Sequence, residues 1–547
     1  GNANAFCMKV ITNFVDPEHV GLRIPLAETN TTSTTQGEGI LMKMRKLFAG
    51  IAAAATLLGG MALGATSAQA DGSGTVVKSD VNFTFTAQDA KQLTNRKLDA
   101  YKIADYVQYG TGSNATYGVQ TAGTVTDNSG IKAALEAAVA GTNKTVPTDG
   151  GDLMAWSLAE GVLSVDNSAD GAWNNSASRK FVESLKTTTD KLGTAEEVDL
   201  GAAANGTSAT VTLPAGLYLF VDADYSVGTN GAATPSIAIL VGSGNVKDGV
   251  LNPLTEATVA IKNQTTAVTK KVNGEDVITA SVGQKVTYTI TSKVPQNTQY
   301  YSDYGYTYTD TPSAGQTVDF DSLKVTVGDK SLNKGTDYTV AQNKNGTFTV
   351  TISSIQKQTA GALITVTYAA KVTEAGASGS KAVTNAVVLS DNGAEATDST
   401  TITNSGFSFT KTDAQGNPLA GATFTIRVPG VDGSFTATSD KTGTVTFKGL
   451  ADGTYEVNET TVPNGFQQSL KAKFNVIIEN GEVKFKGTDV WGLAPKESSD
   501  KYQVKNVKNV TQLPLTGAAG TTLFTVVALL VAGAGVTVAL KSRQRVH

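Results

Sequence analysis

Three polar residues in the last third of the chain share the parity of apolar residues on their predicted strands. Lys411 lies in FSFTKTD two residues after a phenylalanine, whereas Glu459 in YEVNET and Asn506 in YQVKNV each lie two residues after a valine. Alternate residues of a strand face the same side, so all three side chains are expected to face the core. A buried lysine is costly unless it is paired or neutral. The pattern therefore predicts one buried cluster of an amine, a carboxyl and an amide.

A second set of the same residue types occurs earlier in the chain. Lys270 in VTKKV has a valine two residues away on either side, Asp310 in YTYTDTP follows two tyrosines of its own parity, and Asn385 in KAVTNAVV shares the parity of a valine. We expect Lys270 to face inward and Lys271 outward. Two plainer interpretations stay open: an exposed Lys411–Glu459 ion pair, and an Asp310 that belongs only to a turn.

Strand patterns dominate the chain around both sets. Residues 264–400 alternate in runs such as KVTYTITSKV and ALITVTYAAKV, and residues 404–510 contain similar runs joined by turn sequences such as QGNP and ENG. These patterns predict two immunoglobulin-like β-sandwiches. Residues 71–260 add two helical patterns, GIKAALEAAVAG and SRKFVESLKTTTDKL, which predict a mixed β/α domain without a comparable triplet. The expected fold class is mostly β, with tandem immunoglobulin-like sandwiches after this N-terminal domain.

Composition excludes several classes of function. The chain has 547 residues and a net charge of −4, which gives no support to nucleic-acid binding. Its single cysteine is Cys7, and its two histidines are His19 and His547. The long stretch between His19 and His547 therefore has no disulfide, thiol nucleophile, imidazole base or Cys/His metal site. We expect no cofactor, no metal and no enzyme activity.

The first set of residues lies in a recognisable sequence context. KTDAQGNPLAGATFTI together with YEVNETTVPNGF resembles the CnaB-type domain of Gram-positive pilins and adhesins, with conservative departures in the glutamate motif. The resemblance implies an intramolecular isopeptide bond from Lys411 to Asn506, with Glu459 as the acid. The neutral amine would attack the polarised amide, and ammonia would leave.

The second set also lies in such a context. TKKVNG, ASVGQKVTYTI, DTPSAGQT and VTNAVVLSDNG resemble the fimbrial isopeptide-forming D2 domain. This resemblance implies a bond from Lys270 to Asn385, with Asp310 as the acid. A covalent link between the first and last strands of a sandwich would carry tension and replace a disulfide.

The N-terminal residues are interpreted as a targeting segment. Residues 42–46 are basic, residues 47–64 are apolar, and the small residues AQA follow, which is typical of a secretory signal peptide over residues 42–70 with cleavage after Ala70. Residues 1–41 precede this signal and are interpreted as a non-native or mis-started extension.

The C-terminal residues 513–547 combine LPLTG, an apolar run and a basic tail. The run over residues 518–540 is long enough to cross a bilayer, and the basic tail would stay on the cytoplasmic side. The arrangement resembles the cell-wall sorting signal of Gram-positive surface proteins. It implies that sortase recognises Leu513 and Pro514 and cleaves between Thr516 and Gly517.

A lysine at the end of the first domain could accept the Thr516 acyl group. Lys262 lies in ATVAIKNQ, which resembles the pilin motif in its Lys-Asn pair, although Ala260 and Ile261 replace the motif's Tyr and Pro. An ordinary strand lysine is the alternative interpretation. Head-to-tail linkage from Thr516 to Lys262 would not close and would give an open filament.

The resemblances imply a major pilin subunit, secreted and polymerised by sortase into cell-wall-attached fimbriae for adhesion. The implied partners are sortase, copies of the chain itself, minor pilins, peptidoglycan and a host surface protein or glycan. The alternative is a minor pilin or a monomeric wall-anchored adhesin that binds host protein or glycan. A secreted glycosidase with a carboxylate pair is disfavoured, because no further acidic constellation is found.

Overall fold

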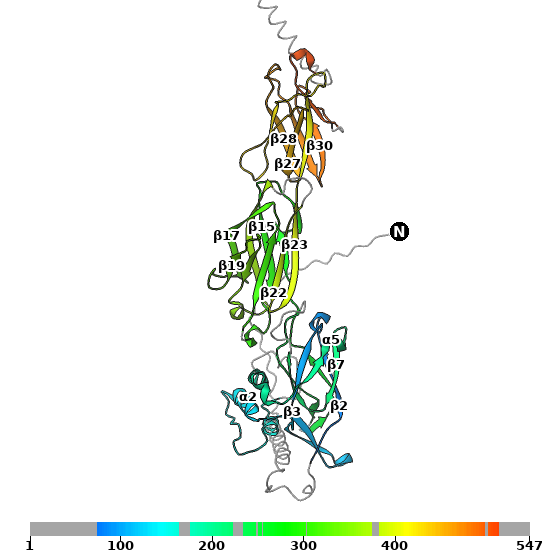
Figure 1. Ribbon diagram of the computed structural model, residues 1–547, viewed down its shortest axis with the longest axis vertical. Helices are drawn as coiled ribbons and strands as arrows, with labels where there is room; N and C mark the ends of the chain where they lie inside the picture. The colour runs from blue at the N-terminus through cyan, green and yellow to red at the C-terminus, as the bar shows by residue number, and fades with distance from the viewer. Residues whose placement is uncertain are drawn as a thin grey trace, which may run out of the picture.

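The protein was analysed as a computed structural model, which describes residues 74–513 except 164–175, 223–232, 248–249, 254, 302, 375–381 and 498–500. Three β-rich modules follow one another along the long axis of the molecule (Figure 1). We call residues 74–263 module 1, residues 264–404 module 2 and residues 405–513 module 3. Each module is built around its own cluster of buried hydrophobic residues, and Ile237 of module 1 packs with the module 2 cluster.

Module 1 combines two sheets and a hairpin. One sheet has the order β1-β3-β8-β9, with β4 and β5 also paired to β3; the other has the order β12-β2-β7-β6, and β10 pairs with β11. Alternation in DVNFTFT buries Phe83 and Phe85 completely, and both rings pack edge-on against Phe220. The strands are β1 (Thr75–Val76), β2 (Asp80–Thr86), β3 (Lys97–Tyr109), β4 (Thr116–Thr121), β5 (Glu196–Asp199), β6 (Ala204–Asn205), β7 (Ser208–Pro214), β8 (Leu217–Asp222), β9 (Ile239–Gly242), β10 (Gly244–Lys247), β11 (Val250–Pro253) and β12 (Glu256–Ala260).

Module 1 also carries helices, with α2 on its left side and the short α5 at its upper right in Figure 1. The apolar stripe of α2 buries Ile131 and Leu135, and the side chains of Asp152 and Ser176 cap the first turns of α3 and α4. The helices are α2 (Ser129–Val139), α3 (Leu153–Ala159), α4 (Ala177–Leu185) and α5 (Leu200–Ala203), with the 3-10 turns η1 (Ala90–Gln92), η2 (Gly112–Asn114) and η3 (Lys186–Lys191). Both predicted helical patterns therefore contain a helix.

Module 2 is a sandwich of two sheets, with the orders β13-β15-β21-β17-β18 and β14-β23-β22-β16-β20-β19. Strict alternation, as in LITVTYAAKV, buries every second side chain against the facing sheet. Its elements are β13 (Thr269–Val272), β14 (Val277–Thr279), β15 (Lys285–Lys293), η4 (Thr298–Tyr300), β16 (Tyr306–Pro312), β17 (Gln316–Val327), β18 (Lys330–Ser331), β19 (Thr339–Gln342), β20 (Phe348–Thr351), η5 (Ile355–Lys357), β21 (Leu363–Val372), β22 (Val383–Asp391) and β23 (Ala394–Thr403).

Module 3 is a smaller sandwich, with the sheets β27-β24-β31 and β26-β25-β28-β29-β30. The parallel pairing of β24 with β31 brings the first and last strands of the module side by side. Its elements are β24 (Ser405–Thr412), β25 (Thr423–Ile426), β26 (Phe435–Thr438), β27 (Thr444–Leu450), β28 (Gly453–Thr461), β29 (Lys473–Glu479), β30 (Glu482–Gly487), β31 (Gln503–Lys505) and η7 (Val510–Gln512).

Direct hydrogen bonds join neighbouring modules. Between modules 1 and 2, the Tyr301 hydroxyl donates to the Pro235 carbonyl at 2.6 Å, and Lys186 Nζ donates to the Tyr300 carbonyl at 3.0 Å. Between modules 2 and 3, the Val282 amide donates to the Gly449 carbonyl at 2.8 Å. These bonds fix how consecutive sandwiches meet.

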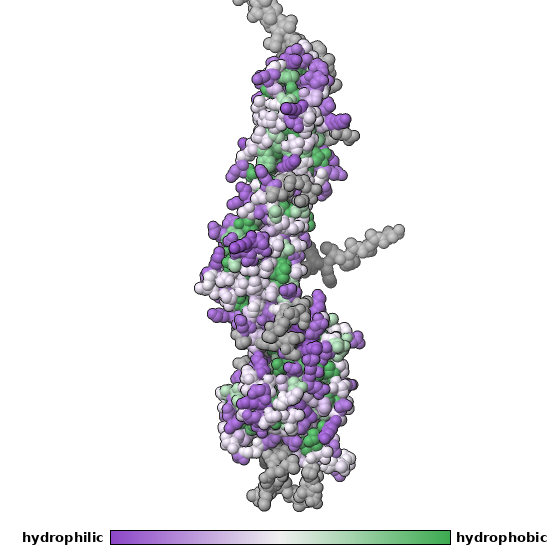
Figure 2. Space-filling view, in the orientation of Figure 1, coloured by the Kyte–Doolittle hydropathy of each residue, from purple (hydrophilic) through white to green (hydrophobic). Residues whose placement is uncertain are grey.

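The surface is mixed in character. Figure 2 shows hydrophilic residues on all three modules, with hydrophobic residues in small groups between them. The large hydrophobic residues that are exposed are Val277, Leu363, Val490, Trp491 and Val510.

The expected mostly-β class with immunoglobulin-like sandwiches is confirmed. Within the described residues no helix is long and apolar enough to span a membrane. The predicted signal peptide with Ala70 and the apolar run over residues 518–540 lie outside the described residues.

Candidate functional sites: three buried lysines

The first site lies between the two sheets of module 2. Lys270 on β13 comes from one sheet, whereas Asp310 on β16 and Asn385 on β22 come from the facing sheet. Each of the three residues is 0–1% exposed. Alternation brings them together as the sequence indicates: Lys270 faces the core, and its neighbour Lys271 pairs with Asp276 at the surface.

The Lys270 amine contacts both predicted partners. It forms a short ion pair with Asp310 Oδ2 and donates to Asn385 Oδ1 at 2.9 Å. The aromatic rings of Tyr288 and Tyr368 line the site, with their centroids 5.1 and 5.5 Å from the amine. The nucleophile, the acid and the amide thus share one water-excluded space.

Burial sets the protonation of this pair. Desolvation lowers the pKa of the Lys270 amine and raises the pKa of the Asp310 carboxyl, in both cases against the mutual attraction of the two groups. Both shifts favour the neutral amine and the neutral acid. A neutral amine can act as a nucleophile, and a neutral acid can polarise the amide carbonyl or donate a proton.

The second site lies in module 3. Lys411 on β24 and Asn506, which directly follows β31, come from neighbouring strands of one sheet, and Glu459 on β28 comes from the facing sheet. Lys411 and Asn506 are fully buried, and Glu459 is 3% exposed. The alternative interpretation, an exposed Lys411–Glu459 ion pair, is excluded because both side chains lie in the core.

Glu459 bridges the other two residues of this site. Its Oε1 lies 3.3 Å from Lys411 Nζ, and its Oε2 accepts from Asn506 Nδ2 at 3.2 Å and from the Ala472 amide at 2.9 Å. Burial lowers the pKa of Lys411 to about 8 and raises the pKa of Glu459. The Asn506 carbonyl oxygen accepts no hydrogen bond from any described residue.

The third buried lysine is Lys262, two residues beyond the end of β12. Its side chain is 0% exposed, and it lies outside the strand itself. Desolvation and the nearby Arg179 guanidinium lower its pKa to about 8. Arg179 is itself held by Glu183 at 3.1 Å and by the Tyr300 ring of module 2.

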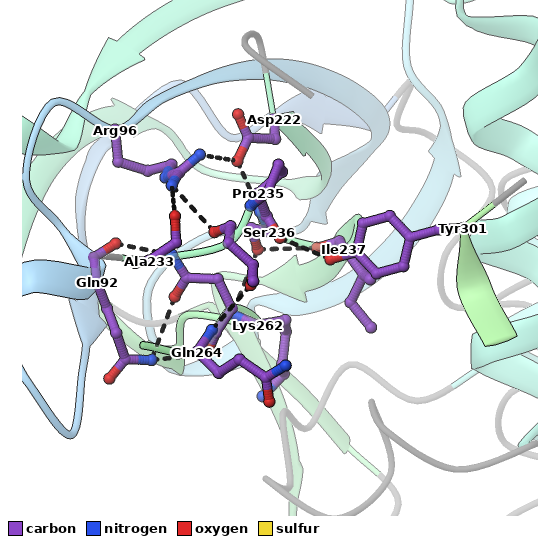
Figure 3. A network of polar contacts seen from close by, with 12 residues as sticks. Gln92, Arg96, Asp222, Ala233, Pro235, Ser236, Ile237, Lys262, Gln264 and Tyr301 are labelled. Atoms are coloured by element: carbon purple, nitrogen blue, oxygen red, sulfur yellow. Dashed lines mark hydrogen bonds and ion pairs between the residues drawn. The ribbon is translucent and has the colours of Figure 1, made fainter. Parts of the chain in front are cut away.

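A polar network fixes the backbone on both sides of Lys262 (Figure 3). Arg96 pairs with Asp222 at 2.7 Å, and Asp222 accepts from the Ser236 amide at 2.7 Å. The Ser236 hydroxyl in turn accepts from the Lys262 amide at 3.3 Å, and the Lys262 carbonyl accepts from the Ile237 amide at 3.0 Å. The backbone at Lys262 is therefore connected through Ser236 to the buried Arg96–Asp222 ion pair.

The sorting signal is only partly described. Leu513 is 6% exposed and packs against the core of module 3. Pro514, Thr516 and Gly517 lie outside the described residues. No group of His, Cys, Asp and Glu suited to a metal is found among the described residues.

Sequence reasoning missed two residues of these sites. Tyr368 lies inside the module 2 cluster, where its hydroxyl donates to Asp310 at 2.9 Å, and Arg179 lies beside Lys262. The parity of Tyr368 in ALITVTYAAKV does indicate an inward side chain, but parity does not separate it from the other buried tyrosines. Arg179 lies on a helix far away in sequence, so no local pattern connects it to Lys262.

Comparisons with known families match three parts of the chain. Residues 405–490 match a prealbumin-like fold domain of the SpaA type, residues 265–404 match the Sgo0707 N2 domain, and residues 505–546 match the LPXTG cell wall anchor motif. A search of curated proteins finds no match.

Solved structures of similar shape include three pilins. The T6 backbone pilin of Streptococcus pyogenes serotype M6 is 18% identical with a TM-score of 0.46, and the alignment covers 76% of this chain and 82% of that one. SpaD, a major pilin of Corynebacterium diphtheriae, is 14% identical (TM-score 0.43; 79% and 98% covered). BcpA, the major pilin subunit of Bacillus cereus, is 14% identical (TM-score 0.38; 79% and 100% covered). At these identities and scores the likenesses carry no functional assignment.

The LPXTG anchor motif, which follows the tandem sandwiches in the sequence, defines a surface protein that sortase attaches covalently to the Gram-positive cell wall. Within that class, residues 265–404 and 405–490 carry the Sgo0707 N2 domain and the prealbumin-like SpaA domain ahead of the anchor.

Proposed function

We propose that the chain is the backbone subunit of a sortase-assembled pilus. Copies are joined head to tail, from Thr516 of one copy to Lys262 of the next. Isopeptide bonds cross-link modules 2 and 3 internally. The observation that carries this proposal is the repeated buried cluster of lysine, acid and asparagine in two successive modules of a wall-anchored chain. Such clusters suit a shaft under shear, because each bond would join an early strand of its module to a late one.

The cross-linking chemistry is the same in both modules. The neutral lysine amine attacks the asparagine carbonyl carbon, the new C–N bond forms, and the amide nitrogen leaves as ammonia. In module 3 Glu459 contacts both Lys411 and Asn506, so one carboxyl can take a proton from the amine and give one to the departing nitrogen. No cofactor is consumed, and the net change is the loss of one ammonia.

Polymerisation requires an amine that attacks the acyl group held by sortase. A pKa of about 8 leaves a larger neutral fraction of Lys262 near neutral pH than the usual lysine value of 10.5 would. The network around Ser236 positions the Lys262 backbone at the junction with module 2 (Figure 3).

The amine is buried in the free subunit, so access to sortase needs a local opening. A cleft of about 680 Å³ runs beside this segment, and its walls include Ile261, Asn263 and Gln296. Lys262 itself is not among the residues that line it. We expect sortase to reach the amine when modules 1 and 2 move apart at Tyr301 and Pro235.

Polymerisation is tested by cell-wall extracts from bacteria that express the chain, boiled in SDS and separated by mass. We expect a ladder of very high mass for the wild type, its loss in Lys262→Arg, and its retention in the matched surface variant Lys271→Arg. A ladder that persists in Lys262→Arg contradicts the acceptor assignment. The lack of any ladder in the wild type would favour a minor pilin or monomeric adhesin.

The cross-links are tested separately by the intact mass of the secreted chain. Each bond removes about 17 Da as ammonia, so two bonds remove about 34 Da. In Glu459→Gln the module 3 bond should not form, so the chain should lose about 17 Da from the module 2 bond alone. A wild-type chain with its full unmodified mass would exclude both bonds.

A further inference from the structure

Tyr368 on β21 lies at the centre of the module 2 cluster. Its hydroxyl oxygen lies 3.0 Å from Lys270 Nζ, donates to Asp310 Oδ2 at 2.9 Å and accepts from Asn385 Nδ2 at 2.8 Å. The residue is 1% exposed, and its ring stacks on Tyr288 and packs edge-on against Phe348. One hydroxyl therefore contacts the nucleophile, the acid and the nitrogen that must leave.

In the module 3 cluster the acid contacts the amide nitrogen directly. There the amide nitrogen of Asn506 donates directly to Glu459, and none of the hydrogen bonds found there involves a tyrosine. Aspartate is one methylene shorter than glutamate. In module 2 the amide nitrogen of Asn385 donates to the Tyr368 hydroxyl, and this hydroxyl in turn donates to Asp310.

We propose that Tyr368 is a catalytic residue of the Lys270–Asn385 cross-link and relays a proton from Asp310 to the departing amide nitrogen. The inference rests on the proposed cross-link in module 2. Tyr368 would connect Asp310 to the Asn385 amide nitrogen. In module 3 the longer side chain of Glu459 contacts the Asn506 amide nitrogen directly.

The relay balances in protons and bonds. Attack forms the Nζ–Cγ bond and leaves an extra proton on Nζ. Attack also gives Nδ2 a free lone pair, and the Tyr368 hydroxyl, which donates to Asp310 before attack, turns to it. Asp310 then passes its proton to the Tyr368 oxygen while Tyr368 passes its own to Nδ2, and the Asp310 carboxylate takes the proton from Nζ. The Cγ–Nδ2 bond breaks, ammonia leaves, and both Asp310 and Tyr368 return to their starting protonation states.

The contacts of Asp310 favour a relay through its Oδ2 atom. The Oδ2 atom contacts both Lys270 and Tyr368, whereas Oδ1 has no hydrogen-bond partner among the described residues. Burial raises the pKa of Tyr368 well above its usual value, so its hydroxyl stays protonated and gives up one proton only as it receives another.

The test is Tyr368→Phe in the full secreted chain, followed by intact mass and by peptide mapping of the Lys270–Asn385 link over time. We expect the wild type to carry both bonds at the first time point. The variant should carry the Lys411–Asn506 bond but form the module 2 bond at least about 100-fold more slowly, the scale of general acid–base catalysis. Complete bond formation in the variant at the first time point would overturn the relay.

Two further variants separate chemistry from packing. Tyr308→Phe removes another buried hydroxyl of module 2, which pairs with Ser292 and does not contact the cluster, so bond formation should stay as in the wild type. Asn385→Ala cannot form the module 2 bond and is the reference for a folded chain without it. If Tyr368→Phe acts only on the chemistry, it should unfold at the same temperature as Asn385→Ala.

Equal slowing in Tyr308→Phe, or unfolding of Tyr368→Phe well below Asn385→Ala, would mean that the hydroxyl acts through packing and would overturn the relay. Absence of the module 2 bond in the wild type would overturn the cross-link itself, and the relay with it. The two failures are therefore distinguishable.

Discussion

Single side chains in this protein gain their chemistry from burial rather than from reactive residue types. Lys262, Lys270 and Lys411 are all fully buried, and desolvation lowers the pKa of each amine. The described part of the chain contains no cysteine or histidine. The neutral forms of these amines can therefore act as nucleophiles, and burial raises the pKa of the carboxyls beside Lys270 and Lys411.

The Lys411 amine should make module 3 pH-dependent when its bond is prevented. In Asn506→Ala the amine stays titratable, and its folded pKa of about 8 lies below the usual 10.5. The unfolded chain then binds more protons between these values, so the free energy of unfolding rises as pH increases from 8 to 10.5. The total approaches roughly 3 kcal/mol.

Urea unfolding of module 3 at several pH values measures this rise. The cross-linked wild type is the control, because its amide nitrogen does not titrate in this range. Burial raises the pKa of Tyr455 and Tyr502 in both proteins, so the rise is read as the difference between the two curves. Equal slopes in the variant and the wild type would contradict the proposed bond.

At the scale of strands, topology decides what each bond can brace. In module 3 the bond would join β24 to the residue after β31, neighbours in one sheet that begin and end the module. In module 2 it would join β13 of one sheet to β22 of the other, and so tie the two sheets together. Both closures span most of their module.

Preventing the module 3 bond should lower stability substantially. Asn506→Ala opens a covalent loop of roughly 95 residues, for which the chain-entropy estimate is about 4.6 kcal/mol. We expect a loss of that order in the free energy of unfolding, measured by chemical denaturation. The control is Asn509→Ala, which removes an exposed amide that caps η7 and should keep the bond at a cost near ~1 kcal/mol. A smaller loss in Asn506→Ala than in Asn509→Ala would argue against a cross-link at Asn506.

The junction between modules 1 and 2 should control access to Lys262. Tyr301→Ala removes a buried ring and its hydrogen bond to Pro235, which loosens the junction. Amine-reactive labelling of Lys262, read by peptide mass, should speed up by about tenfold or more, because local opening exposes the amine. Tyr338→Ala, which removes a buried tyrosine elsewhere in module 2, should leave this labelling unchanged. No acceleration in Tyr301→Ala would place the opening elsewhere.

At the scale of the whole molecule, the three modules form a linear array in which force has a short covalent path (Figure 1). If neighbouring subunits are joined at Lys262 and Thr516, tension enters each chain at the C-terminal end of module 1. The rest of module 1 then carries no tension. With both cross-links formed, tension then passes from Lys270 to Asn385 and from Lys411 to Asn506 without loading the strands between. The shaft should therefore extend very little.

Single-molecule pulling between residues 262 and 513 tests this path. The wild type should show no unfolding step in this interval. Asn385→Ala should release roughly 115 residues, an extension of about 400 Å at ~3.5 Å per residue. The matched variant Asn392→Ala, outside the cluster, should behave as the wild type. A step of similar length in the wild type would show that module 2 lacks a load-bearing bond.

The strand class, the wall-anchoring signal and the inward direction of Lys270, Lys411 and their partners could all be predicted from the amino-acid sequence. These features depend on local periodicity and on contiguous motifs, which a single chain displays directly. Which inward residues meet could be seen in the folded structure alone. It placed Tyr368 among the reacting atoms and brought Arg179 beside Lys262. It also buried Lys262 at a junction between modules. Such contacts join strands and helices that are distant in sequence, and many side chains of one parity are equivalent until the sheets are packed face to face.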